Sequence, residues 1–188
     1  MGPGNPYGSH VVDALIDNQK NFQRRGVCIL NTQDAKKLAQ NPQSQEFKNA
    51  MNSNLTQGFH SLVFPIENPT DDGERPHLNL VKVDCMTKTL TVYGQNNVND
   101  ETTKDMENHA THLATTIYRK KGRSVEFYVK WKNGLTSEGT EDCAVIIVEG
   151  MKTLSKKQEI EDKNLSESQI RNLRLSHILN MQEIHEDQ

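Results

Sequence analysis

A single cysteine, Cys143, lies between an acidic turn and an apolar run, in the segment EDCAVIIV that spans positions 141–148. A thiol attacks carbonyl groups as its thiolate, which a neighbouring imidazolium or the N-terminus of a helix stabilises. His77 stands at the start of the alternating segment HLNLVKVD, which predicts a β-strand. The two residues are therefore the candidate nucleophile and general base of a hydrolase or transferase.

The spacing of apolar residues predicts the elements that must position this pair. Helices are expected at 10–22, 32–38, 47–55, 103–121, 143–154 and 166–184, strands at 62–66, 77–84, 88–93 and 125–131, and a short apolar run at 27–30. Pro65 confines its strand to an edge or a strand end. Gly150 weakens the helix after Cys143, where a strand stays possible. Ser166 and Gln169 form a capping box ahead of the last helix.

Length and charge limit the classes of function. The 188 residues suit one domain with a single core, although 34% hydrophobic residues and a mean hydropathy of −0.77 leave little apolar material to spare. The net charge is −3 and charges of both signs are mixed along the chain, so the sequence does not predict a basic surface that would bind nucleic acid. We expect residues 1–10 to be a flexible lead or a cloning remnant and residues 11–188 to form a single catalytic domain.

The cysteines indicate the compartment. Cys28, Cys85 and Cys143 form no C-x-x-C pair, which argues against a disulfide framework or a structural zinc site. A reducing compartment such as the cytoplasm fits best, and the many Asn, Lys and Gln residues suit a bacterial effector secreted into a host cell. No run approaches the ~20 apolar residues of a membrane span. No cofactor is expected, and oligomeric state is left open.

The two segments around the candidate pair resemble the CE-clan cysteine proteases, which act on ubiquitin-like proteins. The family pattern near the base is His-Trp-x-Leu followed by a strand that ends in Asp; here His77, Leu80 and Asp84 match. The family pattern near the nucleophile is Asp-Cys-Gly, and Asp142 and Cys143 match it. Leu78 and Ala144 depart from it. The resemblance covers roughly positions 62–179 and implies an α+β, papain-like domain with a small mixed central sheet flanked by helices.

Two departures concern the mechanism. The family places an Asp at the end of the hairpin partner strand, where this chain has Gly94-Gln95-Asn96-Asn97. An amide can accept a hydrogen bond from the ring N–H, so Asn96 is the first candidate for orienting the histidine and Gln95 the second. The family also places a glutamine before the cysteine as an oxyanion donor, where this chain has Ser137. The backbone N–H of Cys143, with a donor from the 133–139 loop, is the expected substitute.

The resemblance implies a thiol protease that cleaves after the C-terminal Gly-Gly of ubiquitin or a ubiquitin-like modifier, through an acyl-enzyme. The modifier is left open. One alternative is a YopJ-type acetyltransferase, which uses the same Cys-His pair with acetyl-CoA. Another is a pseudoenzyme that binds such a modifier without cleaving it, because the carboxylate and the glutamine are missing.

Two other groups of histidines compete for a role. His60 precedes the strand that contains Pro65 and is the rival candidate for the base. His109 and His112 lie three positions apart on a predicted helix, but no third metal ligand is visible, so a solvated helix face is expected there and no metal site.

Overall fold

The computed structural model describes residues 9–20, 26–40, 60–67, 78–94, 100–119, 126–137 and 142–186. Its centre is a mixed sheet with the strand order β1-β2-β3-β4-β5. These strands are β1 (Val27–Ile29), β2 (Ser61–Glu67), β3 (Leu78–Asp84), β4 (Thr89–Tyr93) and β5 (Tyr128–Lys132). The pairs β2–β3 and β3–β4 are antiparallel, whereas β1–β2 and β4–β5 are parallel.

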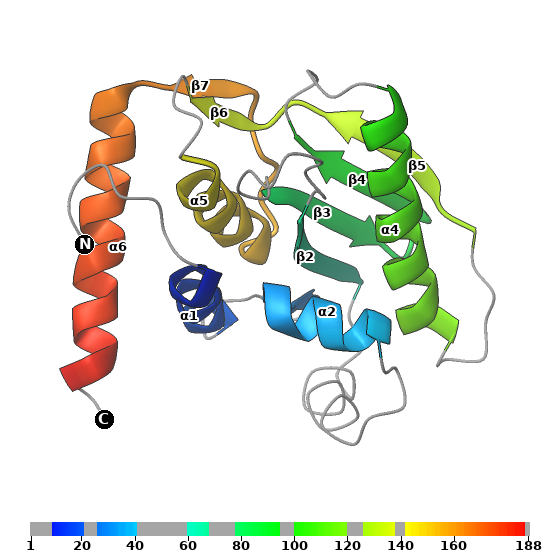
Figure 1. Ribbon diagram of the computed structural model, residues 1–188, viewed down its shortest axis with the longest axis horizontal. Helices are drawn as coiled ribbons and strands as arrows, with labels where there is room; N and C mark the ends of the chain where they lie inside the picture. Colours follow the sequence, from blue (N-terminus) through cyan, green and yellow to red (C-terminus); the bar gives the residue numbers. More distant parts are fainter. Residues whose placement is uncertain are drawn as a thin grey trace.

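Helices cover both faces of this sheet (Figure 1). The helices α2 (Thr32–Gln40) and α4 (Asp100–Arg119) pack on one face, and α1 (Ser9–Lys20) and α5 (Cys143–Ser155) on the other. The last helix, α6 (Glu167–Glu186), lies outside α1 and α5 and contacts both. A separate two-stranded sheet joins β6 (Leu135–Ser137) to β7 (Lys163–Leu165). The expected α+β fold with a small mixed sheet between helices is confirmed.

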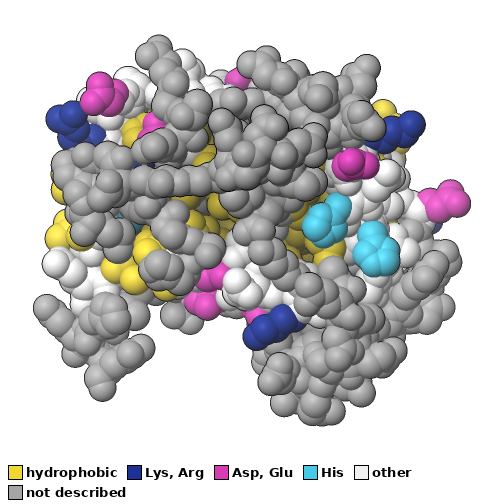
Figure 2. Space-filling view, viewed as in Figure 1, with side chains coloured by type: hydrophobic (Ala, Val, Ile, Leu, Met, Phe, Trp, Pro, Cys, Tyr) yellow, Lys and Arg dark blue, Asp and Glu magenta, His cyan; other side chains and the backbone are white. Residues whose placement is uncertain are grey.

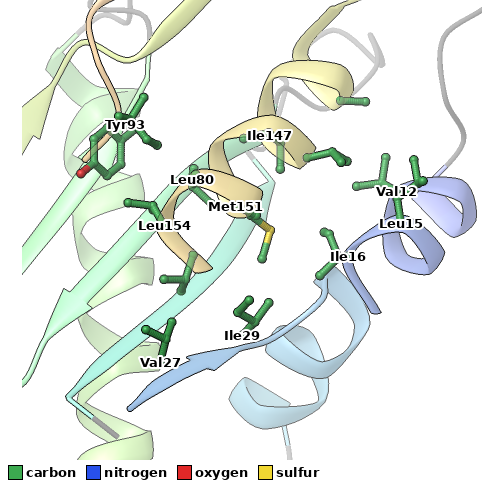
Figure 3. Close-up of a cluster of buried hydrophobic side chains, with 14 of the residues drawn as sticks. Val12, Leu15, Ile16, Val27, Ile29, Leu80, Tyr93, Ile147, Met151 and Leu154 are labelled. Carbon is green, nitrogen blue, oxygen red and sulfur yellow. The ribbon is translucent and has the colours of Figure 1, made fainter. Parts of the chain in front are cut away.

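The apolar core forms two layers because successive side chains of a strand point to opposite faces of the sheet. Phe64 and Val81 pack with Met106 of α4 on one face. Val63 and Leu80, their neighbours in sequence, pack with α1 and α5 on the other (Figure 3). Alternate residues of each strand therefore pack against the helices on opposite faces of the sheet.

The expectation that β2 is an edge strand or that Pro65 ends it is wrong. Along its whole length, from Ser61 to Glu67, β2 pairs with β3. On its other side β1 pairs only from Val27–Ser61 to Ile29–Val63. Pro65 lies beyond that point, so the N–H that proline lacks is not required by β1. An interior strand accepts this proline because its neighbour is short.

Most local predictions are confirmed. The β3–β4 hairpin, the start of a helix at Cys143 and the other described helices lie within a few residues of their expected bounds. The capping box is formed: the Ser166 N–H donates to Gln169 Oε1 at 3.0 Å. The alternating strand begins at Tyr128, later than expected, and part of the expected 133–139 loop is β6. The helix expected at 47–55 lies outside the described residues.

No described helix is both long enough and apolar enough to cross a bilayer.

Candidate active site

Cys143 is the first residue of α5, where its side chain is partly exposed. The helix forms because Ala144, Val145, Ile147 and Val148 are buried against the sheet and α6. The first four N–H groups of any helix lack an intrahelical acceptor, and the helix dipole is positive at that end. An anion at this end of α5, such as the oxyanion of an acyl-transfer intermediate, would therefore be stabilised.

Asp142 occupies the N-cap position of α5 but does not cap the helix. Its backbone is in the right-handed helical region, at φ −93° and ψ −3°, and its side chain makes no capping hydrogen bond. Its carboxylate instead accepts a hydrogen bond from Arg174 of α6, with 2.9 Å between Nη2 and Oδ1. The negative charge nearest to Cys143 in the sequence is therefore compensated by a cation.

Gly150 brings α5 unusually close to β3. A Cβ atom at this position would lie 2.8 Å from Leu80 Cδ2 and 3.2 Å from Ile160 Cδ1. The absence of a side chain therefore allows the helix backbone to approach the strand that follows His77 in sequence. This contact explains a glycine that weakens the helix locally.

The direction of α5 separates Cys143 from His60. The far end of the helix lies near the start of β2, because a Cβ atom on Gly26 would be 3.0 Å from His60 Cδ2 and 3.6 Å from Lys157 Nζ. With 13 residues, α5 is about 20 Å long. Cys143 is therefore remote from His60, which is excluded as its base.

The start of β3 lies at the same end of the sheet as Cys143. Ser61, which follows His60, pairs with Asp84 at the far end of β3. Leu78, at the other end of the strand, packs in the cluster that contains Ala144 from the first turn of α5. Leu78 is therefore at the end of β3 nearer to Cys143, and Asp84 is at the end near His60.

His77, Gln95 and Asn96 lie outside the described residues, but the residues next to them are described. Asn79 is buried, and its Nδ2 donates to Met106 Sδ at 3.1 Å. Gly94, the residue before Gln95, lies directly against it: a Cβ atom on Gly94 would be 2.4 Å from Asn79 Oδ1. The described ends of β3 and β4 thus meet in a tight contact.

Two buried polar residues of α6 face α5, and sequence reasoning missed both. Arg174 is 7% exposed and His177 is 2% exposed. His177 Nε2 lies 3.0 Å from Glu149 Oε1, which also accepts from Lys152 at 3.4 Å. Burial tends to raise the pKa of Glu149, but the hydrogen bonds from His177 and Lys152 outweigh it and hold that pKa below its usual value. The sequence signal for these two residues was an arginine and a histidine three positions apart in the last predicted helix, on the face that its apolar residues share.

Ser137 ends β6, which contacts α5. Its side chain is partly buried, and residues 138–141, which join it to Asp142, lie outside the described residues. The donor expected from the 133–139 loop stays a prediction.

His109 and His112 of α4 are exposed, and histidine side chains are visible on the surface in Figure 2. Partial removal of the His109 ring from water, and secondly the charge of His112, lower the pKa of His109. Within the described ranges, no three His, Cys, Asp or Glu side chains are grouped as metal ligands would be.

No protein-family model matches this sequence, and no curated protein is detectably similar to it. Solved structures share its fold. The SUMO protease Ulp1 with its catalytic cysteine oxidised to a sulfonic acid gives a TM-score of 0.70 at 10% identity, covering 94% of this chain and 78% of that one. The Ulp1 protease domain in complex with SMT3, the yeast ortholog of SUMO, gives 0.65 at 10% identity over 93% and 76%.

A bacterial structure is similar as well. Xanthomonas XopD, described among ubiquitin-like protein proteases, gives a TM-score of 0.53 at 13% identity, covering 89% of this chain and 98% of that one. At these identities the likeness concerns the backbone arrangement. The chain therefore has the fold of the Ulp1-type, CE-clan proteases of ubiquitin-like proteins.

Proposed function

We propose that the protein is a cysteine protease that cleaves after the C-terminal Gly-Gly of ubiquitin or a ubiquitin-like modifier. The observation that carries this proposal is Cys143 at the N-terminus of α5, in a fold shared with the SUMO protease Ulp1. The start of β3 at the same end of the molecule supports it.

In this proposal His77 is the base and Asn96 orients it. The described β3–β4 register pairs Leu80 with Tyr93 and Val81 with Val92. Gly94, which follows Tyr93, lies against Asn79 near the start of β3. An amide oxygen in the segment after Gly94 can accept the ring N–H hydrogen bond, with Asn96 the first candidate and Gln95 the second.

The reaction proceeds by acyl transfer. His77 removes the proton from Cys143 as the sulfur attacks the carbonyl carbon of the last glycine, and the backbone N–H of Cys143 donates to the oxyanion. Collapse of the tetrahedral intermediate breaks the C–N bond, and His77 returns the proton to the leaving lysine amine. Water, deprotonated by His77, then hydrolyses the thioester. We place this reaction in a reducing compartment such as the cytoplasm, which keeps the Cys143 thiol available for attack.

Probes made from ubiquitin, SUMO and a NEDD-type modifier, each with a C-terminal electrophile, test this proposal. We expect one probe to add its mass to the wild-type protein and to Cys85→Ala, a control that removes another partly exposed thiol. Cys143→Ala should give no adduct. His77→Ala should slow the reaction strongly, while His60→Ala should not.

An adduct that persists in Cys143→Ala would refute the assignment of the nucleophile. If no probe reacts and labelled acetyl-CoA acetylates the protein at Cys143, the acetyltransferase replaces the protease. If neither reagent reacts while a modifier binds wild type and Cys143→Ala equally, the protein is a pseudoenzyme.

A further inference from the structure

The buried ion pair between α6 and the start of α5 lies next to the candidate nucleophile. Asp142 and Cys143 are adjacent in sequence, and the side chains of Asp142 and Arg174 are only 16% and 9% exposed. Two charges so weakly exposed to water interact strongly, because solvent screening is reduced. A charge left unpaired at this position would stand one residue away from Cys143 in the sequence.

The hydrogen bond also determines where the Asp142 carboxylate points. Aspartate at an N-cap position commonly accepts hydrogen bonds from the N–H groups of the first turn. Here the carboxylate is directed to Arg174 and makes no such bond. The Asp142 carboxylate therefore does not accept from the first-turn N–H groups, and the anion beside Cys143 is paired with a cation.

We infer that Arg174 is a positioning residue for the reaction: it holds the Asp142 carboxylate away from the N-terminus of α5 and neutralises it, so that no uncompensated carboxylate stands beside the sulfur of Cys143 as it reacts. The inference rests on the proposed function for its role in turnover. Arg174 acts through Asp142 and does not itself touch the substrate. It is supplied by α6, a helix that contributes none of the proposed reacting groups.

The test measures how fast iodoacetamide alkylates Cys143 as a function of pH, followed by mass analysis of the peptide that contains it. This reaction needs no ubiquitin-like substrate, so its result is independent of whether the protein is a protease. Arg174→Met keeps much of the side chain and removes the charge. It should move the midpoint of the alkylation profile up by about one pH unit, which is about a tenfold loss of rate at a fixed pH below the midpoint.

A second variant separates charge from structure. Arg174→Met combined with Asp142→Asn removes both charges of this ion pair, so alkylation should return to within about twofold of the wild-type rate, since a neutral pair avoids the buried unpaired carboxylate. Arg171→Met is the matched control, because Arg171 lies on the same helix, is exposed, and pairs with Glu167 instead. It should leave the profile unchanged.

Three results would overturn the inference. The first is an unchanged profile in Arg174→Met. The second is a double variant as slow as the single one, which would mean that Arg174 only anchors α6. The third is an equal shift in Arg171→Met, which would mean that the effect comes from the overall charge of α6. If alkylation behaves as expected but no modifier probe reacts, the inference about the thiol stands and the protease proposal fails.

Discussion

Replacing Gly94 by alanine tests whether the contact between the ends of β3 and β4 is as tight as the structure indicates. The backbone of Gly94 is not in the left-handed region, so alanine is sterically acceptable to the main chain itself. The added methyl group would, however, lie 2.4 Å from Asn79 Oδ1 and 3.3 Å from Trp131 Cζ3. Any loss of stability therefore comes mainly from the Asn79 side chain.

The size of the effect follows from how little Asn79 can move. Asn79 is 6% exposed, and its amide nitrogen is held by Met106 Sδ. Overpacking a buried site costs about 1–3 kcal/mol, and a contact this short should fall near the upper end, at about 2–3 kcal/mol. Because one kcal/mol lowers Tm by roughly 2–4 °C at this chain length, we expect a fall of about 4–12 °C.

A double-mutant cycle with Asn79→Ala isolates the clash. In the Asn79→Ala background the oxygen is gone, so Gly94→Ala should cost less than about 1 kcal/mol, with a coupling energy of about 2 kcal/mol. Urea unfolding of the four proteins measures it. Gly134→Ala is the matched control: its Cβ would meet Tyr93 at an ordinary 3.5 Å, so it should change stability by less than about 1 kcal/mol.

Additive costs in the two backgrounds would refute this account, because they would mean that Asn79 is not what the new methyl group meets. A Gly94→Ala protein as stable as wild type would refute it as well. Since Gly94 directly precedes Gln95, loss of probe reactivity in Gly94→Ala with recovery in the double variant would connect this packing to the proposed catalytic segment.

Two further predictions concern the sheet and α5. The hydrogen bond from Lys82, together with that from Lys132, lowers the pKa of Glu159 from 4.5 to about 2, so its contribution to folding is complete above pH 4.5 and is lost as the pH falls toward 2. The difference in urea stability between wild type and Glu159→Gln should therefore shrink between pH 5 and pH 2; it should stay small throughout, because the Glu159 side chain is 60% exposed. Gly150→Ala should destabilise the protein by about 1 kcal/mol in thermal unfolding, because overpacking against Leu80 outweighs the roughly 1 kcal/mol that alanine gains over glycine in a helix. A Gly150→Ala protein more stable than wild type would mean that the Leu80 and Ile160 side chains can move aside at little cost in free energy.

The sequence by itself was sufficient for features that depend on neighbouring residues. The alternation in Leu78–Asp84 and Thr89–Tyr93 predicted the hairpin, since a strand with period two needs only local information. Ser166 and Gln169 predicted the start of α6, because a capping box forms within one turn. Asp142-Cys143 before an apolar run likewise predicted that Cys143 begins a helix.

Features that depend on distant parts of the chain were decided only by tertiary structure. Pro65 is accepted inside the sheet because β1 ends before reaching it, which no property of the β2 segment reveals. His60 is excluded as a base because α5 runs toward it with the end opposite Cys143. Arg174 and His177 are buried because they pair with Asp142, at the N-cap of α5, and with Glu149 within α5. Burial of a charged side chain requires a partner, and here each partner is remote in sequence. The polar contacts near the candidate nucleophile therefore could not be predicted without knowing how the helices pack.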